Sequence, residues 1–597
     1  MHFPERSLPC AMPSAHRPEF NEPNEVIKLA DRDNRTDGST TSFHSKSLSG
    51  TQESQISTPI DDDHKEPPQC RDIVDISLKM KILILTCMLW LPVGCHYMEA
   101  TMGTLKTTLK KTMHINNTQF SILLSCVSLV NTVLPLWAGT MVDDLAGLGS
   151  IRSTTLVSCV ILTGSILVSI AFHFNSYPIM ITGQIIYGLG GGMIVTMQEA
   201  IVSRWFRDRQ LAVVVGIMLC IARLTKWAAK MVCYPIIDAT GSNAWPIIIA
   251  NILCAVGVLM NIVYWAIMYH HGGATMLGKE IQVPGSFHAN DLKLHRDQVP
   301  STSSHKPSFR WSSVLFLYVP GIFWMVPWVQ LIMSSVLSSF DDVATEFVQF
   351  RFNTDRVMAG YQSSLTQVVP IVAAPLLGLY VHRYGKRLTI LFFGTIVLLI
   401  SMVLLAYTWV TPAVGMIIFS SAVALGPVAV LSSTPLLLPS ELAGTGMGLH
   451  KCANNIGTTI VSVLVGYVQD LTYHDGDPSD NTADLQTAYD GVMVFYLVLA
   501  CGSIFVSLIF WFMDRRQLQG WLQANQKERQ RRIDTVKAEQ ALYQSDHLKS
   551  SLRMVGSQLR TKRTFIYVSI FCFWLVVSWA IFFSFALMPI YQRYSVT

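Results

Sequence analysis

Two short polar stretches, one in each part of an otherwise apolar chain, decide the fold. The first reads GTMVDDLAGLGSIR (residues 139–152), and the second reads GLYVHRYGKR (residues 378–387). Each has a glycine at the end of an apolar run, a polar residue four positions on, a glycine turn and then basic residues. One copy is typical of any basic loop, but two copies at corresponding places indicate an internal repeat, the usual construction of secondary transporters. The residues that define the two loops are Gly139, Asp143, Gly147, Arg152, Gly378, Arg383, Gly385, Lys386 and Arg387.

The composition of the chain around these loops indicates a membrane protein. Of its 597 residues, 51% are hydrophobic and 14% are charged, whereas a soluble protein is about 25% charged. This excludes a disordered chain, a disulfide-rich secreted module and almost any soluble enzyme. The net charge of +5 is too small and too scattered to predict nucleic-acid binding. The twelve cysteines fall mostly in apolar runs and form no CxxC pair, so no metal or redox site is predicted.

Apolar stretches of spanning length predict an all-α polytopic protein with thirteen transmembrane helices. Six spans lie within residues 79–270 and six within 312–513, separated by a polar loop at 271–311. A charged connector at 514–563 leads to a thirteenth span within 564–597, which we expect at the periphery, contacting a partner or anchoring the tail. The polar residues 1–78 predict a disordered tail without a signal peptide.

The distribution of Lys and Arg predicts a cytoplasmic N-terminus. Basic residues gather in the loops between spans that are expected on the cytoplasmic side. The opposite loops carry acids, among them Asp341, Asp342 and Glu346, because the seventh span is expected at 312–337. Three lysines between residues 106 and 111 are the exception on the outer side. A glycosylation sequon at Asn116 agrees with this orientation.

The two polar loops resemble the signature loop of the major facilitator superfamily: glycine, three residues, aspartate, arginine, one residue, glycine and two bases. His382 stands at the aspartate position of the second copy, and Asp144 at the arginine position of the first. The resemblance covers residues 79–513. It implies a fold of two six-helix bundles around a central cavity, to which the thirteenth helix is added.

Other stretches narrow the resemblance. SRWFRDRQL (203–211) leads to Arg223, LPSELAGT (438–445) leads to Gly448, and PLLG occupies 375–378. Together they are similar to the branch that includes the lysosomal dipeptide transporters. The resemblance implies that Arg223 meets a substrate carboxylate. The acid that this branch would have early in the fourth helix is absent from GGGMI (190–194).

Charged residues inside the predicted spans are the candidate site. Each charge at mid-membrane costs about 2.5–3.5 kcal/mol on insertion scales, so several would not persist facing lipid. Arg223, Lys226 and Lys230 form one stripe of the fifth span. We predict that Arg223 and Lys226 bind an anionic group of the substrate. Pairing with acids of neighbouring helices is the alternative, and we favour pairing or an outward reach for Lys230.

The eleventh span carries a polar group at mid-depth. His450 and Lys451 are followed one turn later by Asn454 and Asn455. These four side chains are candidates for hydrogen bonds to the substrate. They would serve equally well to hold neighbouring helices together.

The first span carries His96 and Glu99, three residues apart near mid-depth. This pair could carry a proton during transport. The alternative is an ion pair of Glu99 with Arg223 or Lys226, whose breakage could be the gating event. Glu199, at the basic end of the fourth span, is expected to form a structural ion pair.

These features predict a secondary transporter, facilitative or proton-coupled, that works by alternating access. The cargo would be a small polar solute with a carboxylate, and the resemblance implies dipeptides or amino acids. The alternative is a solute sensor or assembly partner with a transporter fold. No enzyme motif and no cofactor site are predicted. The expected partners are the substrate, the bilayer and an accessory membrane protein, without nucleic acid, in a vacuolar, lysosomal or plasma membrane.

Overall fold

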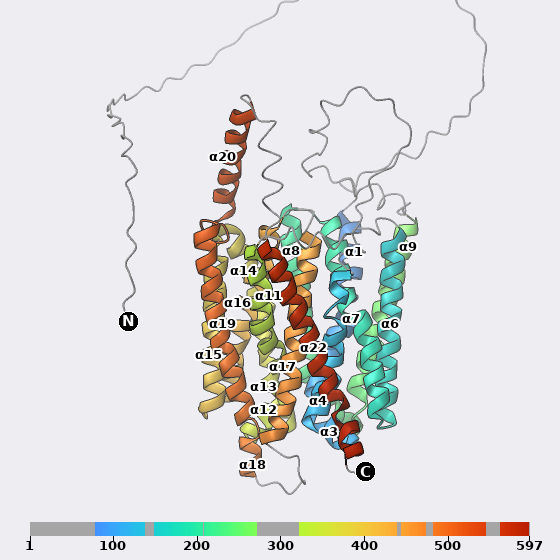
Figure 1. Ribbon diagram of the computed structural model, residues 1–597. Helices are drawn as coiled ribbons and strands as arrows, with labels where there is room; N and C mark the ends of the chain where they lie inside the picture. The colour runs from blue at the N-terminus through green and yellow to red at the C-terminus, as the bar shows by residue number, and fades with distance from the viewer. Residues whose placement is uncertain are drawn as a thin grey trace, which may run out of the picture. The chain divides into compact units, whose positions relative to one another are not determined.

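The computed structural model describes residues 78–137, 148–206, 208–270, 321–438, 443–472, 482–544 and 562–595, which are helical almost throughout (Figure 1). None of these residues forms a strand, and the all-α prediction is confirmed. The predicted polar tail, the central loop and three residues of the first signature loop (Gly139, Asp143 and Gly147) lie outside the described residues. Arg152 lies in a helix, but its side chain is also outside the description.

The first half of the bundle ends at His270. Pro92 interrupts its first span, so that this span is made of two consecutive helices. The helices of this half are α1 (Leu78–Trp90), α2 (Val93–Thr104), α3 (Lys106–Met113), α4 (Asn117–Val130), α6 (Leu148–His173), α7 (Tyr177–Trp205), α8 (Asp208–Thr240) and α9 (Trp245–His270).

The second half begins, in the described residues, with a span built from four short segments. The helices of this half are η3 (Gly321–Trp324), α11 (Met325–Val329), η4 (Gln330–Ser334), α12 (Ser335–Arg351), α13 (Arg356–Ser364), η5 (Leu365–Gln367), α14 (Val368–Tyr384), α15 (Arg387–Tyr407), α16 (Pro412–Ser433), η6 (Thr434–Leu437), α17 (Ala443–Thr472), α18 (Thr482–Thr487) and α19 (Asp490–Gln517). Two further helices follow, α20 (Gln526–Gln544) and α22 (Lys562–Ser595).

Eleven helices of the described residues are long and apolar enough to cross a membrane. The helices α8 and α17, with 33 and 30 residues, are also long enough to do so. They carry several of the charged residues of the candidate site, among them Arg223, Lys226 and Lys451. The eleven apolar helices together with α8 and α17 give the thirteen spans that the apolar runs predict.

The prediction for the end of the seventh span is wrong. This span runs over Gly321–Arg351, so Asp341, Asp342 and Glu346 lie inside α12 and not in an outer loop. The apolar run ends near residue 337, but the helix continues because cations of the other half neutralise two of these three acids, Asp341 and Glu346.

The buried apolar residues of the described chain form two large clusters, one within residues 84–268 and the other within 322–522. Between them, α4 packs along α17, and α8 packs along α13 and α14. Glycines permit the closest approaches. A Cβ atom on Gly466 of α17 would lie 2.7 Å from Ser121 Cβ of α4, and one on Gly103 would lie 2.8 Å from the carbonyl oxygen of Asp342.

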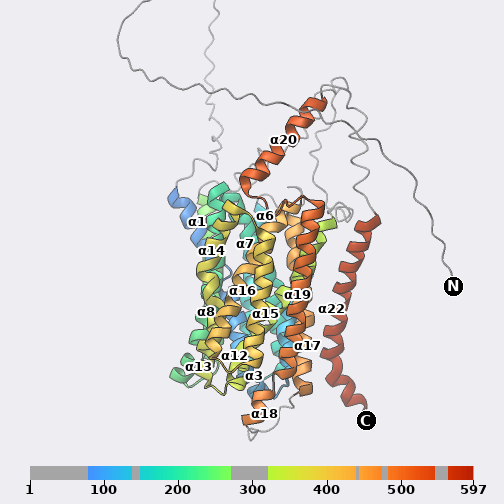
Figure 2. The same cartoon turned by 90° about the vertical axis from the view of Figure 1, so that its left-hand side faces the viewer.

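The thirteenth span, α22, lies at the edge of the bundle and contacts both halves (Figure 2). In Figure 1 it runs obliquely across one face. Its N-terminal part packs on the second half, where Tyr567 stacks on Trp324 with ring centroids 6.4 Å apart. Further along, Phe582 packs against apolar residues of α4 and α17, and Trp579 Nε1 donates to Thr132 Oγ1 at 3.0 Å. The helix therefore covers the seam between α4 and α17.

Candidate functional site

A cavity of ≈ 200 Å³ lies between the two halves. The first half contributes Arg223 and Lys226 from α8. The other walls come from the second half, with polar side chains of η4, α12, η5 and α17 and apolar side chains of α16. The second-half residues are Gln330, Ser334, Leu337, Ser338, Asp341, Asp342, Gln367, Val423, Pro427, Leu431, His450 and Asn454.

The Arg223 side chain reaches across the cavity to a neutral partner. Its Nη1 donates to Gln367 Oε1 at 3.0 Å. The amide nitrogen of Gln367 in turn donates to Asp341 Oδ1 at 2.8 Å. Within the described part of the chain, no carboxylate forms an ion pair with Arg223. The guanidinium is therefore oriented by an amide and keeps its charge unneutralised toward the cavity.

Lys226 and Glu99 form an ion pair within the first half. Lys226 Nζ lies 3.0 Å from Glu99 Oε2, and the Nδ1 atom of His96 lies 3.7 Å from the same oxygen. Of the two cations that we considered as partners of Glu99, the structure thus selects Lys226. The geometry brings together the two residues predicted to carry a proton and one of the residues predicted to bind substrate.

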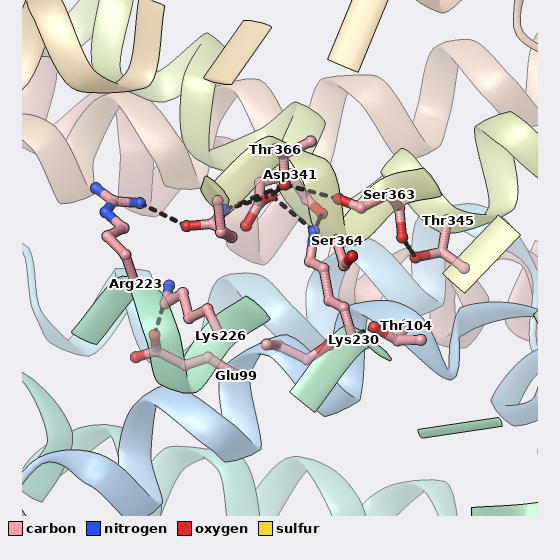
Figure 3. A network of polar contacts seen from close by, with 12 residues as sticks. Glu99, Thr104, Arg223, Lys226, Lys230, Asp341, Thr345, Ser363, Ser364 and Thr366 are labelled. Carbon is pink, nitrogen blue, oxygen red and sulfur yellow. Dashed lines mark hydrogen bonds and ion pairs between the residues drawn. The ribbon is translucent and has the colours of Figure 1, made fainter. Parts of the chain in front are cut away.

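Lys230 joins the two halves and does not reach outward to solvent. Its side chain is buried, and Nζ lies 2.7 Å from Asp341 Oδ1. Thr366 Oγ1 donates to the same carboxylate oxygen at 2.7 Å. Figure 3 shows Lys230 directed at Asp341, whereas Lys226 is directed at Glu99. The stripe of three cations on α8 therefore has three different partners.

His450 and Asn454 of α17 line the cavity. The His450 ring lies between Gln330 Nε2, at 3.0 Å, and Thr434 Oγ1, at 3.3 Å, so its orientation is fixed. The Oδ1 atom of Asn454 is buried and accepts no hydrogen bond from the described residues. This acceptor is available to a bound solute.

Lys451 and Asn455 do not line the cavity. Lys451 Nζ forms an ion pair with Glu199 Oε2 of α7 at 2.7 Å and donates to Thr196 Oγ1 at 3.3 Å. The Asn455 amide donates to the Lys451 carbonyl oxygen at 2.9 Å. Glu199 thus forms the expected ion pair, and its partner Lys451 links α17 of the second half to α7 of the first.

A second buried charge cluster closes the opposite end of the interface. Lys106 and Lys110 of α3 lie 2.5 and 3.1 Å from the two carboxylate oxygens of Glu346. The Tyr489 hydroxyl donates to Glu346 Oε2 at 2.6 Å, and Lys106 donates to Gln469 Oε1 at 2.7 Å. We call these five residues the outer lysine cluster. Sequence reasoning noted the lysines only as an exception to the charge rule, and that exception was the signal of a buried site.

The second signature loop is a packed turn. Gly385 has φ +74°, and a Cβ atom there would lie 2.5 Å from the carbonyl oxygens of Gln523 and Ala524, so glycine is required. The backbone nitrogen of Lys386 donates to Gln523 at 3.0 Å, and Arg387 Nη1 donates to Leu522 at 3.4 Å. The start of the charged connector therefore covers this loop. Arg383 and Gly378 are exposed on the preceding helix, α14.

The arrangement of helices, with a charged cavity between two halves, is that of a multi-pass membrane transporter. The sequence model of the Major Facilitator Superfamily matches residues 89–462 and, in a second segment, 343–596. The chain belongs to this family, and the fold implied by the signature loops is confirmed.

Curated relatives support a narrower relationship. The human lysosomal dipeptide transporter MFSD1 is 23% identical over 407 residues, which cover 66% of this chain and 81% of the relative. The mouse protein of the same name is 21% identical over 479 residues, 78% of this chain and 94% of the relative. The resemblance to that branch is thereby confirmed. A solved structure of the nucleoside transporter NupG, in a mutant form, superposes with a TM-score of 0.51 at 13% identity, covering 73% of this chain and all of that one.

Proposed function

We propose that this transporter carries a small polar solute with a carboxylate group, by alternating access around the central cavity. The observation that supports this most strongly is Arg223, a guanidinium that faces the cavity and has only a neutral amide as its partner. A carboxylate bound there would supply the missing negative charge through charge-assisted hydrogen bonds. His450, Asn454 and Lys226 would complete the binding site.

The relatives support short peptides as the leading cargo and a lysosomal membrane as the location. Glu99 and His96 are the proposed coupling or gating pair. Because Lys226 holds Glu99 in the present geometry, release of that ion pair when the cargo arrives would link binding to the movement of the halves.

Alternating access requires that contacts between the halves break on one side at a time. The outer lysine cluster joins α3 to α12 and α17, and Lys451 joins α17 to α7 nearer the opposite end. These polar contacts are suited to the task because each can exchange its partner for water when the cavity opens.

The test is uptake of a labelled dipeptide into liposomes that contain the purified full-length protein. We expect Arg223→Ala to lower uptake at least tenfold, since a hydrogen bond to a charged group contributes about 1.5–3 kcal/mol. Arg531→Ala is the matched control, because Arg531 is an exposed arginine on α20 outside the bundle. Unchanged uptake by a folded Arg223→Ala protein would remove this site assignment. Thermal stabilisation by dipeptide without any uptake would favour the sensor function instead.

A further inference from the structure

The charges around the cavity do not all cancel within the protein. Lys226 is paired with Glu99, and Lys230 is paired with Asp341. Arg223 remains as one cation with a neutral partner. Asp342 lines the same cavity and forms neither an ion pair nor a side-chain hydrogen bond with any described residue. One positive and one negative side chain are thus left facing the same cavity.

The Asp342 side chain is half-buried at the wall of the cavity. It belongs to the middle of α12, whose backbone α2 approaches so closely here that Gly103 has no room for a side chain. Partial removal of a carboxylate from water without a partner is unfavourable. A cationic group of a bound ligand would offset that cost.

A second unsatisfied acceptor lines the cavity. Asn454 Oδ1 is buried without a donor among the described residues. A carboxylate and an amide oxygen, both acceptors, require a ligand group that donates several hydrogen bonds and carries positive charge. A protonated amine fits this requirement, because it offers three donors on one cation.

We infer that Asp342 binds a protonated amine of the transported solute while Arg223 binds its carboxylate, so that the cargo is recognised as a zwitterion through one residue from each half. This inference rests on the proposed function. The amine and the carboxylate of the cargo would contact different halves. Only a cargo that has both groups would therefore link the two halves.

The cavity has room for a small cargo of this kind. A volume of ≈ 200 Å³ corresponds to about seven molecules of liquid water. This is room for an amino acid or a short dipeptide with small side chains. Val423, Pro427 and Leu431 of α16 form an apolar wall against which such side chains would pack.

The experiment compares two cargoes that differ in one group. Alanylalanine carries an amine and a carboxylate, and lactoylalanine replaces the amine with a hydroxyl group at nearly equal size. We expect the full-length protein in liposomes to take up alanylalanine at least tenfold faster. In Asp342→Asn, alanylalanine uptake should fall at least tenfold to the rate of lactoylalanine, which should itself stay unchanged. Asp534→Asn, an exposed acid on α20, is the matched control and should keep the preference.

Each other outcome has a defined meaning. Equal uptake of both cargoes by the unaltered protein, or a preference retained in Asp342→Asn, overturns the inference and leaves the Arg223 site standing. An equal loss for both cargoes in Asp342→Asn would make Asp342 a proton carrier and also overturns it. The proposed function is tested independently of this inference. It fails if Arg223→Ala changes the uptake of neither alanylalanine nor lactoylalanine. If Asp342→Asn does not fold, Asp342→Glu replaces it and should retain the amine preference, with a loss of preference overturning the inference.

Discussion

Glu346 is the acid on which two lysines of the other half converge. Its side chain is fully buried, as is that of Lys106. We expect Glu346→Gln to lower the free energy of unfolding by about 3–5 kcal/mol, because two ammonium groups in the interior lose their carboxylate. Thermal or denaturant-induced unfolding of the purified protein in detergent measures the change.

A matched control for this substitution is available at the same side of the second half. Asp490 forms an ion pair of 3.2 Å with Arg351, but its side chain is 57% exposed. Asp490→Asn should cost less than about 1 kcal/mol, since water screens an exposed pair. Equal losses for both variants would show that the outer lysine cluster contributes no more than a surface contact.

At the scale of single residues, the sequence predicts which charges lie in the membrane better than it predicts their partners. Arg223, Lys226 and Glu99 are recognisable because a charge inside an apolar run is conspicuous. The partner of Arg223, Gln367, is 144 residues away, and no periodicity relates the two. Asp342 was assigned to a loop because local hydropathy falls after residue 337. Its true place depends on the tertiary neutralisation of the acids beside it.

At the scale of elements, α22 provides the next prediction. Only 11% of its most apolar window is buried, so its removal takes little from either core. Its packing on both α4 and α17 should nevertheless resist their separation. We expect a chain that ends at Gln544 to remain folded and to bind cargo, and to transport faster than the full-length protein. Uptake into liposomes, with size-exclusion chromatography as the check on folding, measures this.

A full-length variant separates this effect from general damage. Trp579→Phe keeps the helix but removes the hydrogen bond to Thr132, and it should raise uptake less than the truncation does. Uptake by the truncated protein at or below the level of the full-length protein, with a normal elution profile, would contradict the restraining role of α22.

The sequence predicts that the helices exist more directly than it predicts where each helix packs. Length and hydropathy predict thirteen spans because a backbone in lipid must satisfy its own hydrogen bonds. The course of α22 over a seam between two halves depends on aromatic contacts such as Tyr567 with Trp324, which join residues far apart in the chain. The sequence of α22 alone is compatible with any peripheral position.

At the scale of the whole molecule, alternating access predicts that α4 and α17 must separate at the ends that lie beside the outer lysine cluster. A Cβ atom on Gly466 would lie 2.7 Å from Ser121 Cβ, and about 1 Å of adjustment gives the Cβ separation of a disulfide. We expect the double variant Ser121→Cys with Gly466→Cys to lose uptake on oxidation and to regain it on reduction. Mass spectrometry of the cross-linked peptides verifies the bond.

The single variants are the controls for this cross-link. Each of them retains the native cysteines, including the buried Cys126 and Cys452 on the same two helices, and neither should respond to oxidation. Uptake that continues in the fully cross-linked protein would show that the halves do not part at this seam.

The outer lysine cluster also has a consequence for synthesis. Lys110 leaves the ribosome 236 residues before Glu346, so Lys106 and Lys110 are synthesised well before the carboxylate that later holds them. The final packing of α3 therefore depends on residues that do not yet exist when α3 is synthesised. A gene split in the central loop should yield a first half that is degraded when it is expressed alone and preserved when the second half is produced in the same cell.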